Sequence, residues 1–520
     1  MNDTDRTAGQ RWQRRAGLAG LALLPLLGAC DGVPTSDAVR EPAPTIGPVS
    51  VGEEIAGYYR ERQYKPLWFA GRKVKPEALA LLQRIEGAAL HGLDPSRYQP
   101  ERLRRAIEAA AGREPQAVAQ AELLISKAFT DFARDLRRPP ERAKMLYVDE
   151  ELRPTVPSPR SLLDSLAKAP AFAPRLELEL GVNPLYDRLA KGFAGYFDRW
   201  SGLPQIQLPA VELRRGMRGG AVGALRRRLG LKQGDRYDAE LADAVRRFEA
   251  AHALNGDGIA DRETIAALNR GYRHYERIIQ ANLDRARALP ASGERFVLVD
   301  TAGARLWLFD RGKAVDTMRV IVGKEAMATP EMAALIRFAA LNPVWNVPPD
   351  LIRTSVAKQV LKQGTGYLKR QRLQVLSDWS PGARVLYPAQ VDWRAVAAGR
   401  RLVQVRQLPG LGNVMGKVKF MFPNKLGIYL HDTPDKNAFM AGQRQISSGC
   451  VRLEDADRLG RWLFKGEMPA PSGAAEQRVY LPEPVPVYIT YLTAVPGPGG
   501  INFQPDVYGR DAKLAQLSTR

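Results

Sequence analysis

Cys450 is the residue of this chain whose type and surroundings best suit covalent chemistry. It stands directly after a glycine in Ser447-Ser-Gly-Cys-Val-Arg-Leu453, and His431 ends a strand-like apolar run 19 positions earlier. A thiol becomes an effective nucleophile when a base removes its proton. A neighbouring glycine lets main-chain N–H groups point at a developing oxyanion. These residues predict acyl transfer, and the alternative is a small buried cysteine that only packs.

Few other residues offer chemistry. The chain has two cysteines and four histidines, and it contains no zinc-type Cys/His cluster, Walker A loop or GxGxxG after a strand. We therefore expect no metal ion and no cofactor. Cys30, the second cysteine, could form a disulfide with Cys450 in an exported protein, although its own context favours another role.

Length and composition limit the classes of protein. A chain of 520 residues is too long for one core and predicts three or four units. A hydrophobic fraction of 45% and a charged fraction of 26% exclude a wholly disordered, collagen-like or polytopic membrane protein. The net charge of +21 predicts attraction to a polyanion, or simply a soluble basic surface.

The N-terminus reads as an export signal. Basic residues at 11–15 precede an apolar run at 18–27, which is shorter than the roughly 20 residues of a spanning helix. Leu27-Gly-Ala-Cys30 resembles a bacterial lipobox, which implies lipidation of Cys30, and Asp31 resembles an inner-membrane retention signal. Ordinary cleavage or an uncleaved anchor are the alternatives. An exported protein meets no genome, so we expect no nucleic acid partner, but rather lipid headgroups or wall carboxylates.

Periodicity predicts a multidomain α+β chain. Apolar spacing is helical over most of 51–270 and changes to the alternation of strands from residue 295, with a long basic interruption that we interpret as a helical lid. The expected units are a signal peptide with lipobox (1–30), a tether (31–50), a helical scaffold (51–205), a helical unit (211–270), a β-rich catalytic domain (295–490) with the lid inserted at 350–406, and a C-terminal tail (491–520).

Two motifs carry a family resemblance. Tyr429-Leu-His-Asp-Thr-Pro434 and Ser447-Ser-Gly-Cys-Val-Arg452 together resemble the active-site signature of the L,D-transpeptidase (YkuD-type) catalytic domain, over about 295–465. The scaffold, lid and helical unit are similar to the large YcbB-like branch. The unit at 211–270 resembles a three-helix peptidoglycan-binding domain, and the alternative is a helical spacer. The chain departs from many members at Ser448, where they have histidine.

The resemblance implies roles residue by residue. Cys450 would be the nucleophile and His431 the general base and later acid. Asp432 could orient the imidazole, although a main-chain carbonyl could do so equally well. Tyr429 and Arg452 could instead serve only strand packing and surface charge. The remaining implied roles are oxyanion-hole N–H groups from Gly449 and Cys450, and substrate binding by Tyr429, Arg452, Ser447 and Ser448.

The implied reaction joins two peptidoglycan stems. The thiolate would attack a stem tetrapeptide, release D-Ala and pass the acyl group to a neighbouring stem as a 3→3 crosslink. The predicted partners are peptidoglycan stem peptides and, through the lipid anchor, the periplasmic face of the inner membrane; the sequence does not define an oligomeric state. L,D-carboxypeptidase activity, attachment of the wall to an outer-membrane protein, and a non-catalytic wall-binding lipoprotein are the alternatives.

Overall fold

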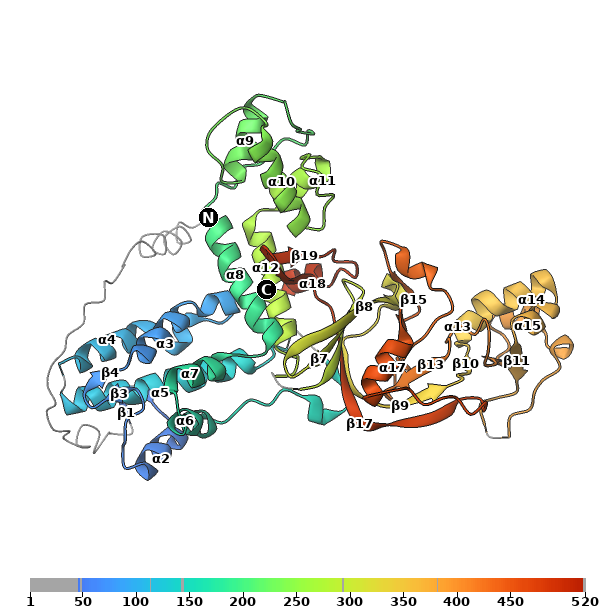
Figure 1. The fold of residues 1–520 in the computed structure, drawn as a ribbon, viewed down its shortest axis with the longest axis horizontal. Coiled ribbons are helices and arrows are strands. Elements are labelled where there is room, and N and C mark those ends of the chain that lie inside the picture. Colours follow the sequence, from blue (N-terminus) through green and yellow to red (C-terminus); the bar gives the residue numbers. More distant parts are fainter. Residues whose placement is uncertain are drawn as a thin grey trace.

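The computed structural model describes residues 45–46, 49–112, 114–141, 145–291, 294–380 and 382–517. The predicted signal peptide, the lipobox with Cys30 and most of the tether lie outside these residues. The described chain is a multidomain α+β structure, which confirms the predicted fold class. Figure 1 shows a helical region, a second helical unit and a β-rich region arranged around two central helices, α8 (Pro184–Trp200) and α12 (Tyr272–Ala286). Within the described residues, no helix has the length and apolar character that crossing a membrane requires.

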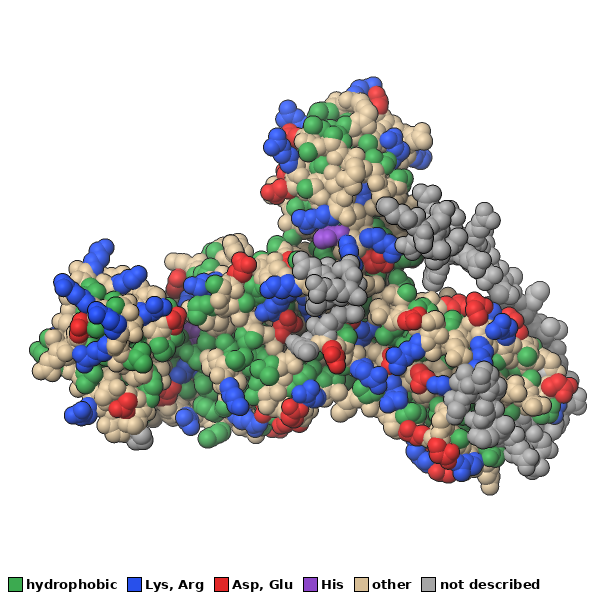
Figure 2. All heavy atoms as spheres, turned by 180° about the vertical axis from the view of Figure 1, so that it is seen from behind, with side chains coloured by type: hydrophobic (Ala, Val, Ile, Leu, Met, Phe, Trp, Pro, Cys, Tyr) green, Lys and Arg blue, Asp and Glu red, His purple; other side chains and the backbone are tan. Residues whose placement is uncertain are grey.

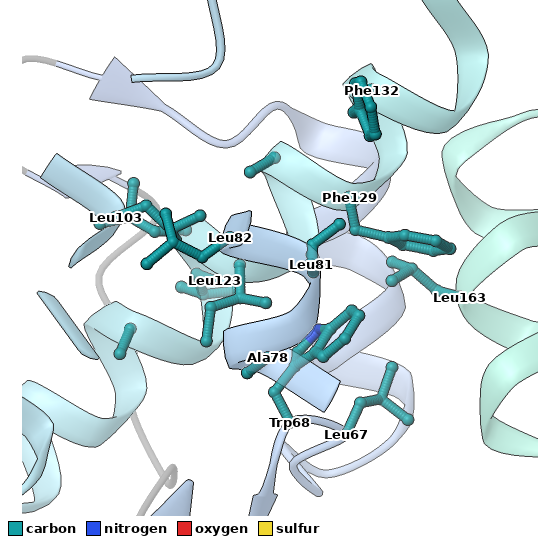
Figure 3. Packing of buried hydrophobic residues seen from close by; sticks show 14 of the residues in the cluster. Leu67, Trp68, Ala78, Leu81, Leu82, Leu103, Leu123, Phe129, Phe132 and Leu163 are labelled. Carbon is teal, nitrogen blue, oxygen red and sulfur yellow. The ribbon is translucent and has the colours of Figure 1, made fainter. Parts of the chain in front are cut away.

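The N-terminal region packs around the long helix α5. Proline occupies the first turn of several of its helices, where its missing N–H costs no intrahelical bond. Trp68 and Phe129 meet edge to face at 5.5 Å within the buried core shown in Figure 3. The region contains α2 (Glu53–Glu61), β3 (Phe69–Ala70), β4 (Lys73–Val74), α3 (Pro76–Glu86), α4 (Pro100–Ala110), α5 (Pro115–Arg137), α6 (Pro159–Ala167) and α7 (Phe172–Leu180).

The second helical unit has a small core, formed by α9 (Gly220–Arg228), α10 (Ala239–Ala251) and α11 (Arg262–Arg270) together with Trp200 of α8 and Tyr272 of α12. Asp238 and Asp261 cap α10 and α11 by accepting hydrogen bonds from main-chain N–H groups of their first turns. The buried Glu249 accepts hydrogen bonds from the Gly258 N–H and the Thr264 hydroxyl, and so ties the turn between these helices to α10.

A closed sheet forms the β-rich region. Its neighbours run β13-β14-β16-β8-β7-β6-β17-β9, and β9 pairs again with β13. The buried apolar side chains of these strands fill one core together with α17 (Ala456–Phe464). The strands are β6 (Phe296–Asp300), β7 (Arg305–Asp310), β8 (Lys313–Gly323), β9 (Met332–Leu341), β13 (Val418–Met421), β14 (Leu430–His431), β16 (Val451–Leu453) and β17 (Gln477–Thr490), and β15 (Gln445–Ser447) pairs beside β8.

The insert after β9 is less helical than the sequence predicts. It contains a three-stranded sheet as well as helices, and both pack around a separate apolar core. The short strands were missed because the basic residues between them mask their alternation. The elements are β10 (Trp345–Asn346), α13 (Pro349–Leu351), a π-helical turn (Ile352–Val356), α14 (Ala357–Gln363), α15 (Gly366–Arg370), β11 (Leu373–Leu376), α16 (Trp393–Ala397) and β12 (Gln404–Gln407).

Two segments cross the predicted boundaries. Strand β5 (Leu146–Tyr147), from the predicted scaffold, pairs in parallel with β9, and Asp149 accepts a hydrogen bond from the Leu335 N–H. The described part of the predicted C-terminal tail is folded, because β18 (Ala494–Gly497), β19 (Gly500–Phe503) and α18 (Arg510–Leu517) pack back onto the body. Burial of Ile501 and Phe503 against α8 and α12 favours this docking.

The contact between α8 and β19 depends on a glycine. A Cβ at Gly192 would lie 2.8 Å from both the Gly500 carbonyl oxygen and Ile501 Cδ1, whereas one at Gly195, about a turn further along, would meet nothing within 4 Å. The helix and the hairpin therefore approach so closely that no residue larger than glycine fits at position 192.

We expect Gly192→Ala to lower the free energy of unfolding of this joint by about 1–3 kcal/mol through overpacking. Gly195→Ala is the matched control, and it should be neutral or gain up to about 1 kcal/mol from helix propensity. Thermal and urea denaturation of the two variants would measure the difference. Equal midpoints would show that the two elements are not tightly packed.

Candidate active site

The two predicted catalytic residues come together on neighbouring strands. β14 and β16 pair in parallel, with Leu430 opposite Val451 and His431 opposite Arg452. Leu430 and Val451 lie in the core of the closed sheet. Because side chains alternate along extended backbone, His431 in β14 and Cys450, which directly precedes β16, both project from the opposite face, on segments about 4.8 Å apart.

His431 is held in one tautomer. Its Nδ1 lies 2.6 Å from the main-chain oxygen of Asp432. A carbonyl only accepts, so Nδ1 carries the proton and Nε2 keeps its lone pair. Burial lowers the pKa of His431 to about 3, against the hydrogen bond to Asp432, which raises it. The imidazole is therefore neutral near pH 7 and can accept a proton.

The Asp432 carboxylate does not orient this imidazole. Its Oδ2 accepts a hydrogen bond from the Lys417 N–H at 2.9 Å, and its Oδ1 pairs with Lys436 Nζ at 2.7 Å. Of the two alternatives left by the sequence, the structure has the main-chain carbonyl at the imidazole. The predicted catalytic role of the Asp432 side chain is corrected to one that fixes the flanking turns.

Cys450 has opposing influences on its pKa. Burial raises the pKa of the thiol, whereas hydrogen bonds from Tyr429 and the positive charges of Arg452 and Lys419 lower it. The Sγ atom lies 3.5 Å from the Gly427 carbonyl oxygen. The thiol therefore rests in a site that favours the neutral form, with two cations close enough to stabilise a thiolate.

The turn before Cys450 is fixed by its own hydrogen bonds. Gly449 has a φ of +115°, which a residue with a Cβ adopts only with strain. The buried Ser447 donates to the Cys450 carbonyl at 2.7 Å and accepts from the Gly449 N–H at 3.2 Å. Thr329 donates to the Gly449 carbonyl at 2.7 Å.

These bonds engage two groups that have predicted roles. Ser447 was expected to bind substrate, but its hydroxyl is buried and engaged within the turn. The Gly449 N–H was expected in an oxyanion hole, but it already has an acceptor. Ser448 is exposed and leaves the predicted substrate contact available.

Tyr429 and Arg452 lie on the same face as the catalytic pair. The Tyr429 ring is 5.7 Å from that of His431. Burial, followed by the neighbouring Cys450, raises the pKa of Tyr429, so its hydroxyl remains a hydrogen-bond donor. Arg452 is partly buried beside the thiol, which disfavours a plain surface charge.

Lys419 is a further residue of the site, and it was not predicted from the sequence. This buried lysine is opposite His431 in the β13–β14 register, and its Nζ lies 5.6 Å from the Tyr429 ring centroid. It donates to the Val344 carbonyl at 3.1 Å, at the base of the insert, and forms an ion pair with Glu476. Lys419 lies between two apolar residues, Val418 and Phe420, which are both in the core. This alternation was the sequence signal that could have placed Lys419 on the opposite face of the sheet.

No group of three or more His, Cys, Asp or Glu suited to hold a metal occurs in the part of the chain that the structure describes. Of the other histidines, His91 is hydrogen-bonded to Tyr186 in the helical region, while His252 and His274 lie near the second helical unit.

Comparison with known proteins assigns the separate regions. Residues 294–487 match the L,D-transpeptidase catalytic domain, residues 222–268 a provisionally assigned peptidoglycan binding domain, and residues 53–192 a scaffold domain. A Haemophilus influenzae protein with the provisional name L,D-transpeptidase is 30% identical over 245 residues, which are 45% of this chain and 48% of that protein. The chain thus matches about half the length of this curated relative.

Solved structures give weaker likenesses. An L,D-transpeptidase from Xylanimonas cellulosilytica is 17% identical, with 55% of this chain and 98% of that chain covered at a TM-score of 0.18. L,D-transpeptidase 3 from Mycobacterium tuberculosis is 11% identical, with 39% and 62% covered at a TM-score of 0.20. Superpositions this poor carry no weight, so the assignment depends on the sequence families.

The chain therefore carries an L,D-transpeptidase catalytic domain together with a peptidoglycan-binding domain.

The Lys419 charge should be visible in the reactivity of the thiol. Lys419→Met removes a cation that favours the thiolate, so the pKa of Cys450 should rise and alkylation at neutral pH should slow, about tenfold for a shift of one unit. The rate of iodoacetamide alkylation against pH measures this shift. Lys419→Arg should keep the parent profile, as should Lys417→Met, since the side chain of Lys417 is exposed. A parent profile in Lys419→Met would contradict the role.

Proposed function

We propose that this protein is a cysteine L,D-transpeptidase that forms 3→3 peptidoglycan crosslinks from tetrapeptide stems and releases D-Ala. The observation that carries the proposal is the single face shared by Cys450 and His431, with the His431 Nδ1–H bonded to a carbonyl and Nε2 left as the base. A thiol and an imidazole so arranged suit acyl transfer and require no cofactor.

Cys450 and His431 are both neutral before substrate binds, and this determines the order of proton transfers. Burial disfavours both the thiolate and the imidazolium. The Cys450 proton therefore passes to His431 Nε2 as sulfur attacks the carbonyl carbon that precedes D-Ala. The imidazolium then protonates the leaving amine of D-Ala, and a thioester remains on Cys450.

In the second half-reaction, the side-chain amine of another stem attacks the thioester. His431 Nε2 takes the proton from this amine and returns it to the departing Cys450 sulfur, which closes the cycle. Two N–H groups are candidates for the oxyanion. The Cys450 N–H is one; the Gly449 N–H is the other only if it leaves Ser447.

The substrate contacts follow from the surrounding charges. Arg452 and Lys419 are cations beside the thiol and suit the carboxylates of a stem peptide. Tyr429 offers a hydroxyl donor next to the sulfur, and Ser448 an exposed hydroxyl. The insert at 350–406 serves as a lid that keeps water from the thioester, and Lys419 joins its base to the site through Val344.

The other predicted features complete the proposal. Cys30 carries the lipid anchor, which holds the enzyme at the inner membrane, and the unit at 211–270 binds the wall. The same residues would also serve an L,D-carboxypeptidase or an enzyme that attaches a protein to the wall, since only the acceptor differs. Muropeptide analysis of cells with and without the protein distinguishes these products, and acylation of Cys450 by a carbapenem excludes a non-catalytic wall-binding protein.

Removing either member of the pair should stop the reaction. Cys450→Ala should abolish D-Ala release and dimer formation on purified stems, because a methyl group is no nucleophile. His431→Ala should slow acylation about 10²- to 10⁴-fold through loss of the base. His274→Ala is the control and should keep turnover of soluble stems. Dimer formation by Cys450→Ala would refute the mechanism.

The insert should control the fate of the acyl group. Replacing 350–406 by a short Gly/Ser turn should lower the ratio of crosslinked dimer to trimmed tripeptide, because water then reaches the thioester. Chromatography of the products measures the ratio, and circular dichroism checks the fold. If the folded variant keeps the parent ratio, the insert is a docking surface and not a lid.

A further inference from the structure

A cavity lies away from the catalytic face, between the peptidoglycan-binding unit, α12 and the C-terminal segment. Its volume is about 880 Å³, within the range of about 300–1,000 Å³ typical of small-molecule sites. Two other hollows in the described chain measure about 20 and 10 Å³, which leaves little more than room for one water. Figure 2 shows histidine and basic side chains gathered at this junction.

One stripe of α11 forms a wall of the cavity. Glu263, Ala266, Ala267 and Arg270 all line it and recur at the spacing of a single helical face. Glu263 and Arg270 are seven residues apart, which is about 10 Å along the helix. The oppositely charged Glu263 and Arg270 therefore lie at the two ends of a stretch of wall formed by alanines.

A stripe of α12 supplies further positive charge. His274, Arg277, Ile278 and Ala281 line the cavity with the same helical spacing. Burial lowers the pKa of His274, and Arg270 and Arg277 lower it further, whereas Asp511, which also lines the cavity, raises it. Neither arginine has a carboxylate partner among the ion pairs of the described residues. Three further acids line the cavity but have other partners: Asp284 pairs with Arg287, Asp511 pairs with Arg285, and Asp506 accepts a hydrogen bond from the Tyr491 hydroxyl. The end of the cavity at Arg270 thus suits an anion.

The C-terminal segment closes the cavity. Phe503 lines it and stacks on His252 with ring centroids 4.8 Å apart, and Tyr275 meets the same imidazole at 4.6 Å. Gln504 and Pro505 extend this wall. The site is therefore composite, because the peptidoglycan-binding unit alone provides only the α10 and α11 side of it.

We propose that this cavity binds a peptidoglycan stem peptide, with a free carboxylate at Arg270 and Arg277 and the amine of its diamino residue at Glu263. The identity of the ligand rests on the proposed function, since it takes the enzyme to work on the wall. The site is distinct from the catalytic one and would hold a stem without reacting with it.

Binding of a free tripeptide stem, L-Ala-γ-D-Glu-diamino acid, to the full chain by calorimetry tests the proposal. All proteins carry Cys450→Ala, and a tripeptide with amidated carboxylates is the ligand control. Arg270→Gln with Arg277→Gln should weaken binding at this site about tenfold or more. Ala266→Phe, which fills the cavity from an exposed position on α11, should abolish binding at this site and leave the binding of the stem at the catalytic face, which Cys450→Ala retains.

Arg273→Gln is the matched control, because Arg273 lies on α12 about one turn from Arg277 but pairs with Glu276 and does not line the cavity. It should bind as the parent does. Binding of the tripeptide unaffected by both Ala266→Phe and the arginine pair, or equal binding of the amidated peptide, would overturn the proposal.

The same substitutions in the Cys450 protein separate this site from the reaction. D-Ala release from soluble tetrapeptide should stay at the parent rate in all of them, since none touches the catalytic face. A chain that binds the tripeptide here but releases no D-Ala would refute the proposed transpeptidase function and leave the cavity assignment standing.

Discussion

The catalytic face depends on the burial of Leu430 and Val451 on the other side of the sheet. Because side chains alternate, two apolar residues in the core force Tyr429, His431, Cys450 and Arg452 together on the opposite face. A register slip of one residue would bury the imidazole and thiol among the strands of the core and expose the two apolar side chains. Packing in the core therefore specifies the reactive geometry.

Burial also sets the resting state of the pair. The same desolvation raises the pKa of Cys450 and lowers that of His431, so an ion pair is disfavoured until a substrate is attacked. Lys419 and Arg452 oppose the rise in the pKa of Cys450 without cancelling it, and they lower the pKa of His431 further. Lys419 also connects the site to the insert. Its ammonium group, which lowers the pKa of Cys450, donates a hydrogen bond to the Val344 carbonyl at the base of the insert.

The C-terminal segment holds the units of the molecule together. Its hairpin packs between α8 and α12, Phe503 reaches His252 beside the peptidoglycan-binding unit, and Arg510 bonds to the Thr329 carbonyl next to the cysteine turn. Strand β5 adds a second connection by extending the closed sheet from the scaffold side. These contacts make the chain one assembly rather than separate units on linkers.

The sequence by itself determined the α+β class, the helical unit and the two motifs that contain His431 and Cys450, because periodicity and short motifs are local properties. It also determined the insert, though not its strands. Only the tertiary structure decided that a carbonyl and not the Asp432 carboxylate holds the imidazole, that Ser447 fixes the turn, and that Lys419 lies beside the thiol. Each of these depends on side-chain direction or on the pairing of strands distant in sequence. The folding of 494–517 was not predicted for the same reason, since Ala494, Ile501 and Phe503 are buried by helices that lie more than 200 positions earlier.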